Sequence, residues 1–403
     1  MNETESERSA GAPMTGRILG LPRNIFLLGL TSLFNDFSSE MVYAVFPAFF
    51  TTVLGAGAAS LGLVDGIAEA SANLFKIYSG HLSDRFQVRK PLVVSGYTLS
   101  VLTRPFYTLV TMVPGALALR FLDRVGKGVR DSARDAIISL STPKEELGRS
   151  FGYHRAMDTM GAILGPLVAY LILSRFPANF NFVFLAAFGI GLLAIASLIF
   201  ISDVVVRAGA KRAQLIESFA RFSTGFRLYL VSMFVLSMGA LPVSVILLKT
   251  ESIGLVIADV PLFYMVYNLS YAGFSMAAGR ASDRIGSRTV ILAGYGVLLL
   301  SYYVLNIAHS AWALVLGFLV LGLFPALTDG VQRAFASKLT SDELRGSGLG
   351  WLNAMNGFGA LLAGLVGGYL WQARGPGSAF LAAGAAVVAG LTILFLSSRT
   401  KSV

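Results

Sequence analysis

The chain has 403 residues, of which 55% are hydrophobic and only 13% are charged. A soluble globular domain carries about 25% charged residues, so this composition excludes a water-soluble globule and indicates a membrane protein. No cysteine is present, which excludes disulfides, cysteine zinc sites and thiol catalysis.

The polar N-terminal residues 1–24 lack the short apolar core of a cleaved signal peptide, so we expect a flexible tail. After them come apolar blocks of about 20 residues, long enough to cross a ~30 Å hydrocarbon core. Hydropathy predicts an all-α membrane protein with twelve transmembrane helices, centred near residues 37, 69, 101, 127, 163, 191, 238, 268, 298, 324, 360 and 388. The longest polar stretch, 202–226, is predicted to be a cytoplasmic connector between a bundle at 25–201 and a bundle at 227–397, with a cytoplasmic tail at 398–403.

The basic residues outside the predicted helices are distributed unevenly between the loops. Alternate segments, which include both termini and the connector, hold nearly all of them, whereas the opposite loops hold only Arg175, Lys249 and Arg374. This distribution follows the positive-inside rule. It places both termini in the cytoplasm, requires an even number of spans, and explains the net charge of +10 without a nucleic-acid partner.

The two predicted bundles repeat one another in sequence. Gly80-His-Leu-Ser-Asp84-Arg85 returns about 200 residues later as Gly279-Arg-Ala-Ser-Asp283-Arg284. A second match on the fifth helix has nearly the same offset, because Ala156-Met157 returns as Ala354-Met355. Internal symmetry of this kind is typical of transporters built from two halves, with the solute site between them.

These repeated segments resemble the major facilitator superfamily, and the likeness covers nearly the whole chain. The loop after the second helix is similar to motif A of that family, with a partial copy after the eighth helix. The resemblance implies two pseudo-symmetric six-helix bundles, which this loop latches together in the outward-facing state. Glycine permits a tight turn there, and aspartate is favoured at a helix N-terminus. The implied latch residues are Gly80, Asp84, Arg85, Gly279, Asp283 and Arg284.

Two further segments add to this resemblance. The fifth helix carries Gly161-Ala-Ile-Leu-Gly165-Pro166, which is similar to motif C, a motif found mainly in proton-coupled exporters. The fourth helix is loosely similar to motif B, with Arg120 at the position of its membrane arginine. Its run Asp123-Arg124-Val-Gly126-Lys127-Gly128-Val-Arg130 resembles a bacterial subgroup of the superfamily.

Ionisable residues are concentrated within the predicted helices of the first half. A charge at mid-bilayer costs a few kcal/mol, so each needs a partner or a water-filled cavity. Carboxylates lie at i,i+4 spacing on the first two helices, and basic residues form a stripe along the fourth. The sequence leaves two interpretations open: the charges pair to fasten the helices, or they bind protons and solute. The candidates for proton coupling are Asp36, Glu40, Asp65 and Glu69, and the basic candidates for solute binding are Arg120, Arg124 and Lys127.

The second half has fewer ionisable residues within its helices and carries clusters of aromatic residues. Three tyrosines at i, i+3, i+7 spacing on the eighth helix form a face that could stack against a solute, although tyrosine is also common at membrane interfaces. Two asparagines on the eleventh helix stand where the first half has Arg155 and Asp158. The solute-binding candidates from this half are Tyr267, Tyr271, Asp329, Asn353 and Asn356.

Other chemistry finds no support in the sequence. It contains no P-loop motif for ATP and no G-x-S-x-G nucleophile motif. The three histidines share no metal-ligand spacing. The sequence therefore predicts a protein that is not an enzyme and that uses no cofactor or metal.

The sequence as a whole predicts a monomeric secondary transporter in a bacterial-type inner membrane. The fifth-helix motif favours proton-coupled export of a small organic solute by alternating access, as in efflux antiporters. The basic excess on the fourth helix leaves uptake of an anionic metabolite or metal chelate as an alternative. A lipid flippase is an alternative of another class, because the first half is charged and the second is more apolar. The expected partners are a small solute, anionic in the second interpretation, together with protons and membrane lipid.

Overall fold

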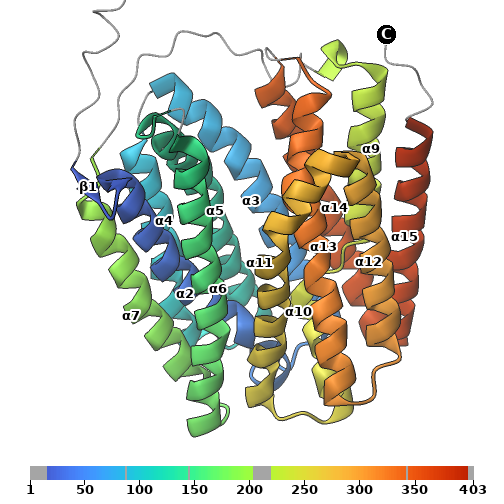
Figure 1. Cartoon of the computed structure of the whole chain (residues 1–403). Helices are drawn as coiled ribbons and strands as arrows, with labels where there is room; N and C mark the ends of the chain where they lie inside the picture. The colour runs from blue at the N-terminus through green and yellow to red at the C-terminus, as the bar shows by residue number, and fades with distance from the viewer. Residues whose placement is uncertain (1–15, 87–88, 144–145, 203–218, 342–343, 398–403) are drawn as a thin grey trace, which may run out of the picture.

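Two groups of helices lie side by side in the computed structural model, which describes residues 16–86, 89–143, 146–202, 219–341 and 344–397 (Figure 1). The predictions for residues 1–15, for most of the connector and for residues 398–403 therefore fall outside the described residues. At the start of the described chain, part of the expected N-terminal tail forms a short antiparallel hairpin of β1 (Arg17–Ile18) and β2 (Leu21–Pro22). Arg17 ties this hairpin to Glu146 at 2.7 Å.

The first half consists of six long helices, drawn from blue to green in Figure 1. They are α2 (Arg23–Thr52), α3 (Ala58–Phe86), α4 (Lys90–Phe106), α5 (Val113–Leu140), α6 (Leu147–Arg175) and α7 (Phe180–Ile199), with a helical turn η1 (Tyr107–Leu109) after α4. Their apolar core is partly aromatic, and Phe46, Phe49 and Phe184 are fully buried within it. Each predicted centre of the first six spans falls within one of these helices.

The second half repeats this arrangement, except that its first membrane segment is broken. That segment consists of α9 (Thr224–Met238), α10 (Val243–Leu247) and the helical turn η3 (Leu248–Ile253). After the turn η4 (Ile257–Asp259) come α11 (Val260–Ile285), α12 (Ser287–Asn306), α13 (Ala311–Lys338), α14 (Arg345–Arg374) and α15 (Pro376–Ser397). The predicted seventh centre, residue 238, falls at the break itself. Hydropathy found this span because it averages over the break.

Seven helical segments of the described chain are long and apolar enough to cross a membrane by length and composition alone. They are α6, α7, the broken segment from α9 to η3, α12, α13, α14 and α15. Charged side chains lower the hydropathy of α2, α3 and α5, so these helices depend on the rest of the bundle to shield their polar groups.

The two halves meet most closely where α3 crosses α14. A methyl group on Gly364 would overlap the carbonyl oxygen of Gly62, and one on Gly368 would press against Ala58. Glycines at such a crossing let the two backbones approach each other directly, as is common in membrane helix packing. The contacts of α3 with α14 run from Ala58 to Asn73, so they lie towards the end of the molecule that contains the loop at Gly57.

The orientation of the chain in the membrane is still a prediction from the distribution of basic residues. A reporter that is active only in the cytoplasm should be active when fused after Lys211, and a periplasmic reporter should be active when fused near Gly57. Periplasmic activity after Lys211 would contradict the predicted topology.

Candidate solute site

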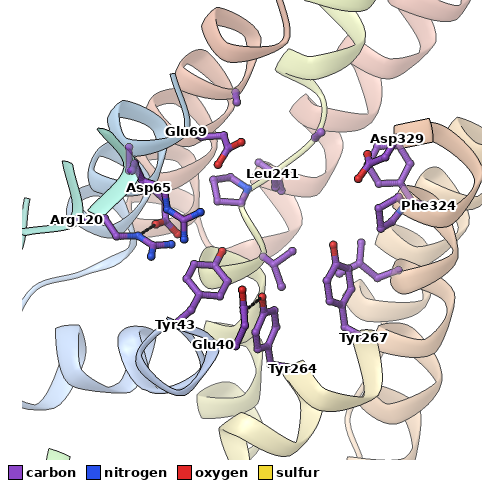
Figure 2. A pocket seen from close by; sticks show the side chains of 18 of the residues that line it. Glu40, Tyr43, Asp65, Glu69, Arg120, Leu241, Tyr264, Tyr267, Phe324 and Asp329 are labelled. Atoms are coloured by element: carbon purple, nitrogen blue, oxygen red, sulfur yellow. Dashed lines mark hydrogen bonds and ion pairs between the residues drawn. The ribbon is translucent and has the colours of Figure 1, made fainter. Parts of the chain in front are cut away.

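A cavity of about 350 Å³ lies between the two halves, and Figure 2 shows the side chains around it. From the first half, α2, α3 and α5 contribute its wall. From the second half, the break between α9 and α10 lines it, together with residues of α11 to α14. Among its lining residues are Glu40, Tyr43, Asp65, Glu69, Arg120, Arg124, Lys127, Leu241, Tyr264, Tyr267, Phe324 and Asp329.

Arg120 is held by carboxylates on its own half of the molecule. Its Nε lies 3.1 Å from Asp65 Oδ1 and its Nη1 lies 3.7 Å from Asp123 Oδ2, and all three side chains are largely buried. The guanidinium also lies over the ring of Tyr43, 4.6 Å from its centroid. The hydroxyl of Ser244 donates a hydrogen bond to the other oxygen of Asp65, which links this ion pair to α10 of the opposite half. Arg120 and Asp65 thus form a fixed pair that joins α5, α3 and α10.

The rest of the basic stripe on α5 is divided between the cavity and the interior of the first half. Arg124 lines the cavity and has Nε 3.4 Å from Asp123 Oδ2. Lys127 lines the cavity as well, and within the described residues no carboxylate lies within 4.0 Å of its ammonium group. Arg130, by contrast, lies over the ring of Tyr97 on α4 at 4.4 Å. Further along, Asp131 pairs with Arg134 at 3.4 Å and with Lys76 of α3 at 3.3 Å.

Glu40 faces the cavity and makes a hydrogen bond to the opposite half. The hydroxyl of Tyr264 donates to Glu40 Oε2 at 2.6 Å (Figure 2). Across the described part of the chain, no basic group lies within 4.0 Å of this carboxylate. Asp36, one turn away on α2, is not among the cavity-lining residues, and its Oδ1 accepts a hydrogen bond from Asn35 at 3.0 Å.

The glycines of the fifth-helix motif lie directly against these two acidic residues. A methyl group on Gly161 would come within 3.0 Å of the Cβ of Asp36, and one on Gly165 within 2.9 Å of the Cβ of Glu40. Pro166 follows within the same helix and is buried. The motif therefore lets α6 pack closely on the segment of α2 that carries both acids.

The second half contributes tyrosines and one carboxylate. Tyr264 and Tyr267 stack with their ring centroids 5.8 Å apart, and both line the cavity. Asp329 lies on the opposite side of the cavity from Glu69 in Figure 2. Tyr271 lies outside the lining, but its hydroxyl donates to Asp329 Oδ2 at 3.0 Å and accepts from Arg155 Nη2 at 2.5 Å.

Several predicted site residues lie elsewhere. Asn353 and Asn356 do not line the cavity, and Asn356 instead bonds Ser237 at 3.0 Å within the second half. Of the predicted latch, the backbone of Gly80, Asp84 and Arg85 belongs to α3, but their side chains fall outside the described residues. Gly279, Asp283 and Arg284 lie in the last turns of α11, where all three are exposed. The latch therefore stays a prediction.

The break in the seventh segment is a part of the site that the sequence analysis missed. Tyr302 of α12 satisfies the interrupted backbone, because its hydroxyl accepts from Leu241 N at 2.9 Å and donates to Gly239 O at 2.8 Å. The signal was Pro242, since proline lacks the N–H that a continuous helix requires. Ser244, at the start of α10, makes two hydrogen bonds to the first half: its hydroxyl donates to Asp65, and its backbone N–H donates to the hydroxyl of Tyr43 at 3.3 Å.

Comparison with known proteins agrees with this architecture. The sequence profile of the Major Facilitator Superfamily matches residues 28–255 and 227–403. An uncharacterised MFS-type transporter of Methanocaldococcus jannaschii is 35% identical over 390 residues, which cover 93% of this chain and 95% of that protein. The multidrug resistance protein MdtH of Proteus mirabilis is 22% identical over 347 residues, 82% of this chain and 83% of that protein.

Among solved structures, a mutant of the nucleoside transporter NupG superposes with a TM-score of 0.79 at 16% sequence identity. The superposition covers 94% of this chain and 100% of that chain, and it confirms the predicted all-α membrane fold. The chain therefore belongs to the Major Facilitator Superfamily, and it is a multi-pass membrane transporter rather than an enzyme.

Proposed function

We propose that this protein exports a small organic solute carrying a protonated amine and an aromatic or apolar body, in exchange for protons. The observation that carries the proposal is the balance of charge around the cavity. Arg120 is already paired with Asp65 and Asp123, and Arg124 shares Asp123. Among the described lining residues this leaves Glu40, Glu69 and Asp329 with no basic group within 4.0 Å, against Lys127 alone.

A carboxylate in a low-dielectric cavity is costly without a positive partner. Each of these three acids can meet that cost in two ways, by taking a proton or by binding a cationic solute. Because the two alternatives exclude one another at the same oxygen atoms, proton entry promotes solute release. This competition is the physical basis of an exchange of solute for protons.

The aromatic residues suit the remainder of such a solute. The rings of Tyr43, Tyr264, Tyr267 and Phe324 line the cavity between the acids. An ammonium group close to an aromatic face gains about 0.5–2 kcal/mol, more when it is desolvated. The volume of about 350 Å³ lies at the small end of ligand sites, which favours a single compact molecule.

The direction of transport is supported by two observations. The fifth-helix motif packs against Glu40, so the segment that resembles proton-coupled exporters contacts a coupling candidate directly. A relative that covers most of the chain is named as a multidrug resistance protein. In the predicted orientation, with both termini in the cytoplasm, the close contacts of α3 with α14 lie towards the external end. This arrangement corresponds to an inward-facing state, ready to receive solute from the cytoplasm.

Uptake of an anion is the second candidate, and it rests on Arg124 and Lys127. The structure weakens the argument from the basic stripe, because Arg130 and Arg134 are engaged with groups of the first half. The two candidates predict opposite ligand preferences.

Three ligands that share a phenyl ring distinguish the cation exporter from the anion transporter. At neutral pH 2-phenylethylamine is a cation, phenylalanine a zwitterion and 3-phenylpropionate an anion. We expect 2-phenylethylamine to raise the apparent melting temperature of the purified protein most, because a ligand at 100 times its Kd stabilises by about 2.7 kcal/mol. Asp329→Asn should reduce this shift. Asp259→Asn, which removes an acid outside the cavity lining, should not. Stabilisation by 3-phenylpropionate alone would favour the anion transporter instead.

A further inference from the structure

Arg104 is a buried arginine without an acidic partner in direct contact. It lies near the end of α4 with only 2% of its surface exposed. Within the described residues no carboxylate lies within 4.0 Å of its guanidinium. Its donors go instead to α2: one to the hydroxyl of Ser38, and Nη2 to Asn35 Oδ1 at 2.9 Å. Burial of a cation without an ionic partner costs free energy, so the hydrogen bonds that compensate it are strongly favoured and hold Asn35 and Ser38 in place.

The contact with Arg104 determines which way the Asn35 amide points. A guanidinium has only donors, so it must face the amide oxygen of Asn35. The amide nitrogen is then directed to the other side, where Nδ2 donates to Asp36 Oδ1 at 3.0 Å. Asn35 is fully buried, so water does not reach its amide, whereas Asp36 is partly exposed. The positive charge of Arg104 thus reaches the Asp36 carboxyl group through an oriented amide dipole.

A second contact region connects Arg104 with the solute site. A small cavity of about 10 Å³, the size of one water molecule, is lined by Ser39, Thr103, Arg104, Arg120 and Asp123. Arg120 and Asp123 belong to the ion-pair group that holds Asp65 at the large cavity. Arg104 therefore lies between Asp36 on one side and the buried ion pairs on the other.

Other charged groups also face Asp36, and they set the background for its titration. Asp158 and Arg155 approach from α6, Lys127 and Arg130 from α5, and Glu40 lies on the same helix. These groups include both signs. Within the described residues, Asn35 is the one side chain that donates a hydrogen bond to the Asp36 carboxyl group, so a change at Asn35 acts on this group most directly.

We propose that Arg104 and Asn35 are positioning residues for Asp36. Together they fix the orientation of its carboxyl group and favour its ionised form, and so set the pH at which Asp36 exchanges protons. This inference rests on the proposed proton coupling, but it concerns residues that do not line the solute cavity.

The test follows protonation of Asp36 without any solute. Infrared difference spectra of the purified full-length protein in lipid, titrated with pH, should contain a carboxyl band that Asp36→Asn removes. In Asn35→Leu the midpoint of this band should move to higher pH by about one unit, because a hydrogen bond to a charged group contributes about 1.5–3 kcal/mol and one unit corresponds to 1.36 kcal/mol. Arg104→Gln should shift the midpoint in the same direction, and the double variant should shift it no further than the larger single change.

Two variants serve as controls. Asn24→Leu removes another buried asparagine of α2, which bonds Ser141 and the backbone of Ser202 at 3.2 and 3.1 Å, so it should lower stability but leave the midpoint unchanged. Arg104→Lys keeps a cation and a donor to Asn35, and it should largely retain the wild-type midpoint. If Arg104→Gln does not fold, Asn35→Leu and Arg104→Lys still give the comparison.

An unchanged midpoint in folded Asn35→Leu and Arg104→Gln would overturn the inference, as would a wild-type protein in which Asp36 does not titrate. The proposed function is tested separately by whether a proton gradient drives 2-phenylethylamine flux in proteoliposomes. If the gradient drives flux but the midpoint of the Asp36 band is the same in the variants as in the wild type, only the role of Arg104 and Asn35 is contradicted. If the midpoint shifts in the variants but the gradient drives no flux, the proton coupling is contradicted and the positioning role stands.

Discussion

Replacement of Glu40 by glutamine is expected to abolish proton-driven accumulation of solute while leaving solute exchange without a gradient measurable. Glu40 lines the cavity, and Tyr264 of the opposite half donates to it at 2.6 Å. Its protonation can therefore affect both solute binding and the contact between the halves. Glutamine keeps the size and can still accept from Tyr264, but it cannot carry a proton.

The measurement uses proteoliposomes and labelled 2-phenylethylamine. With an imposed pH gradient, the variant should reach only the concentration ratio expected of an uncoupled carrier. Exchange of internal for external label at equal pH should continue within about a factor of ten of wild type, a difference of about 1.4 kcal/mol. Loss of both activities in a protein that inserts normally would instead indicate a structural role for Glu40.

Glu251→Gln is the matched control. Glu251 also accepts a hydrogen bond across the two halves, from the hydroxyl of Thr51 at 2.8 Å, but it does not line the cavity. Its replacement should leave uphill transport intact. If Glu40→Gln accumulates solute with unchanged pH dependence, then Asp36, Asp65 and Glu69 are the next coupling candidates, and Asp36→Asn is the variant to examine first.

The pattern of charges predicted which helices carry the site, but it could not predict how the charges pair. Asp36 and Glu40 lie on one face of the same helix at i,i+4 spacing, so the sequence could not separate them. Only the position of the cavity does so, because Glu40 lines it and Asp36 does not, although a glycine of α6 packs against each of them. The same holds for Tyr267 and Tyr271, since the cavity reaches the first and not the second.

The ion-pair partners of Arg120 could not be predicted from the sequence for a related reason. The sequence placed Arg120 deep in the membrane and offered several acids, but the choice of Asp65 depends on the crossing of α3 and α5, which no local pattern encodes. Asn353 and Asn356 were proposed from the internal repeat alone. The repeat carries over backbone position, but a neutral amide in the second half bonds within its own bundle rather than facing the solute. The periodicity of the sequence thus predicts which residues share one face of a helix, whereas the ion pairs depend on how the helices contact one another.

Addition of a single methyl group at Gly364 is expected to shift the protein towards a state that is open at the Gly57 end. A Cβ on Gly364 would overlap the carbonyl oxygen of Gly62, which belongs to the backbone of α3 and cannot rotate away as a side chain can. The two helices must therefore separate at this point. Overpacking typically costs about 1–3 kcal/mol, which corresponds to a shift of roughly 5- to 150-fold in the ratio of the two states.

The absence of cysteine makes this shift directly measurable, because labels can be attached to introduced cysteines alone. Val53 and Val256 are exposed at the end where α3 and α14 meet, with 48% and 66% of their surfaces accessible. Leu140 and Leu339 are exposed at the ends of α5 and α13, each with 38% accessible. Spin labels at 53 and 256 should move apart in Gly364→Ala, whereas labels at 140 and 339 should approach one another.

Gly359→Ala provides the control for a simple loss of stability. Gly359 lies on the same helix and is packed as tightly, but against Ser237 and Phe234 of its own half. Its methyl group should lower the melting temperature without changing the distance between labels at 53 and 256. Gly62→Ala should reproduce Gly364→Ala, because a methyl group there would meet the carbonyl oxygen of Gly364. If neither glycine variant separates the labels at 53 and 256, the crossing of α3 and α14 does not control the closed state. Other contacts between the halves at that end, such as the hydrogen bonds from Thr51 to Glu251 and from Ala59 N to Gln372, would then hold it.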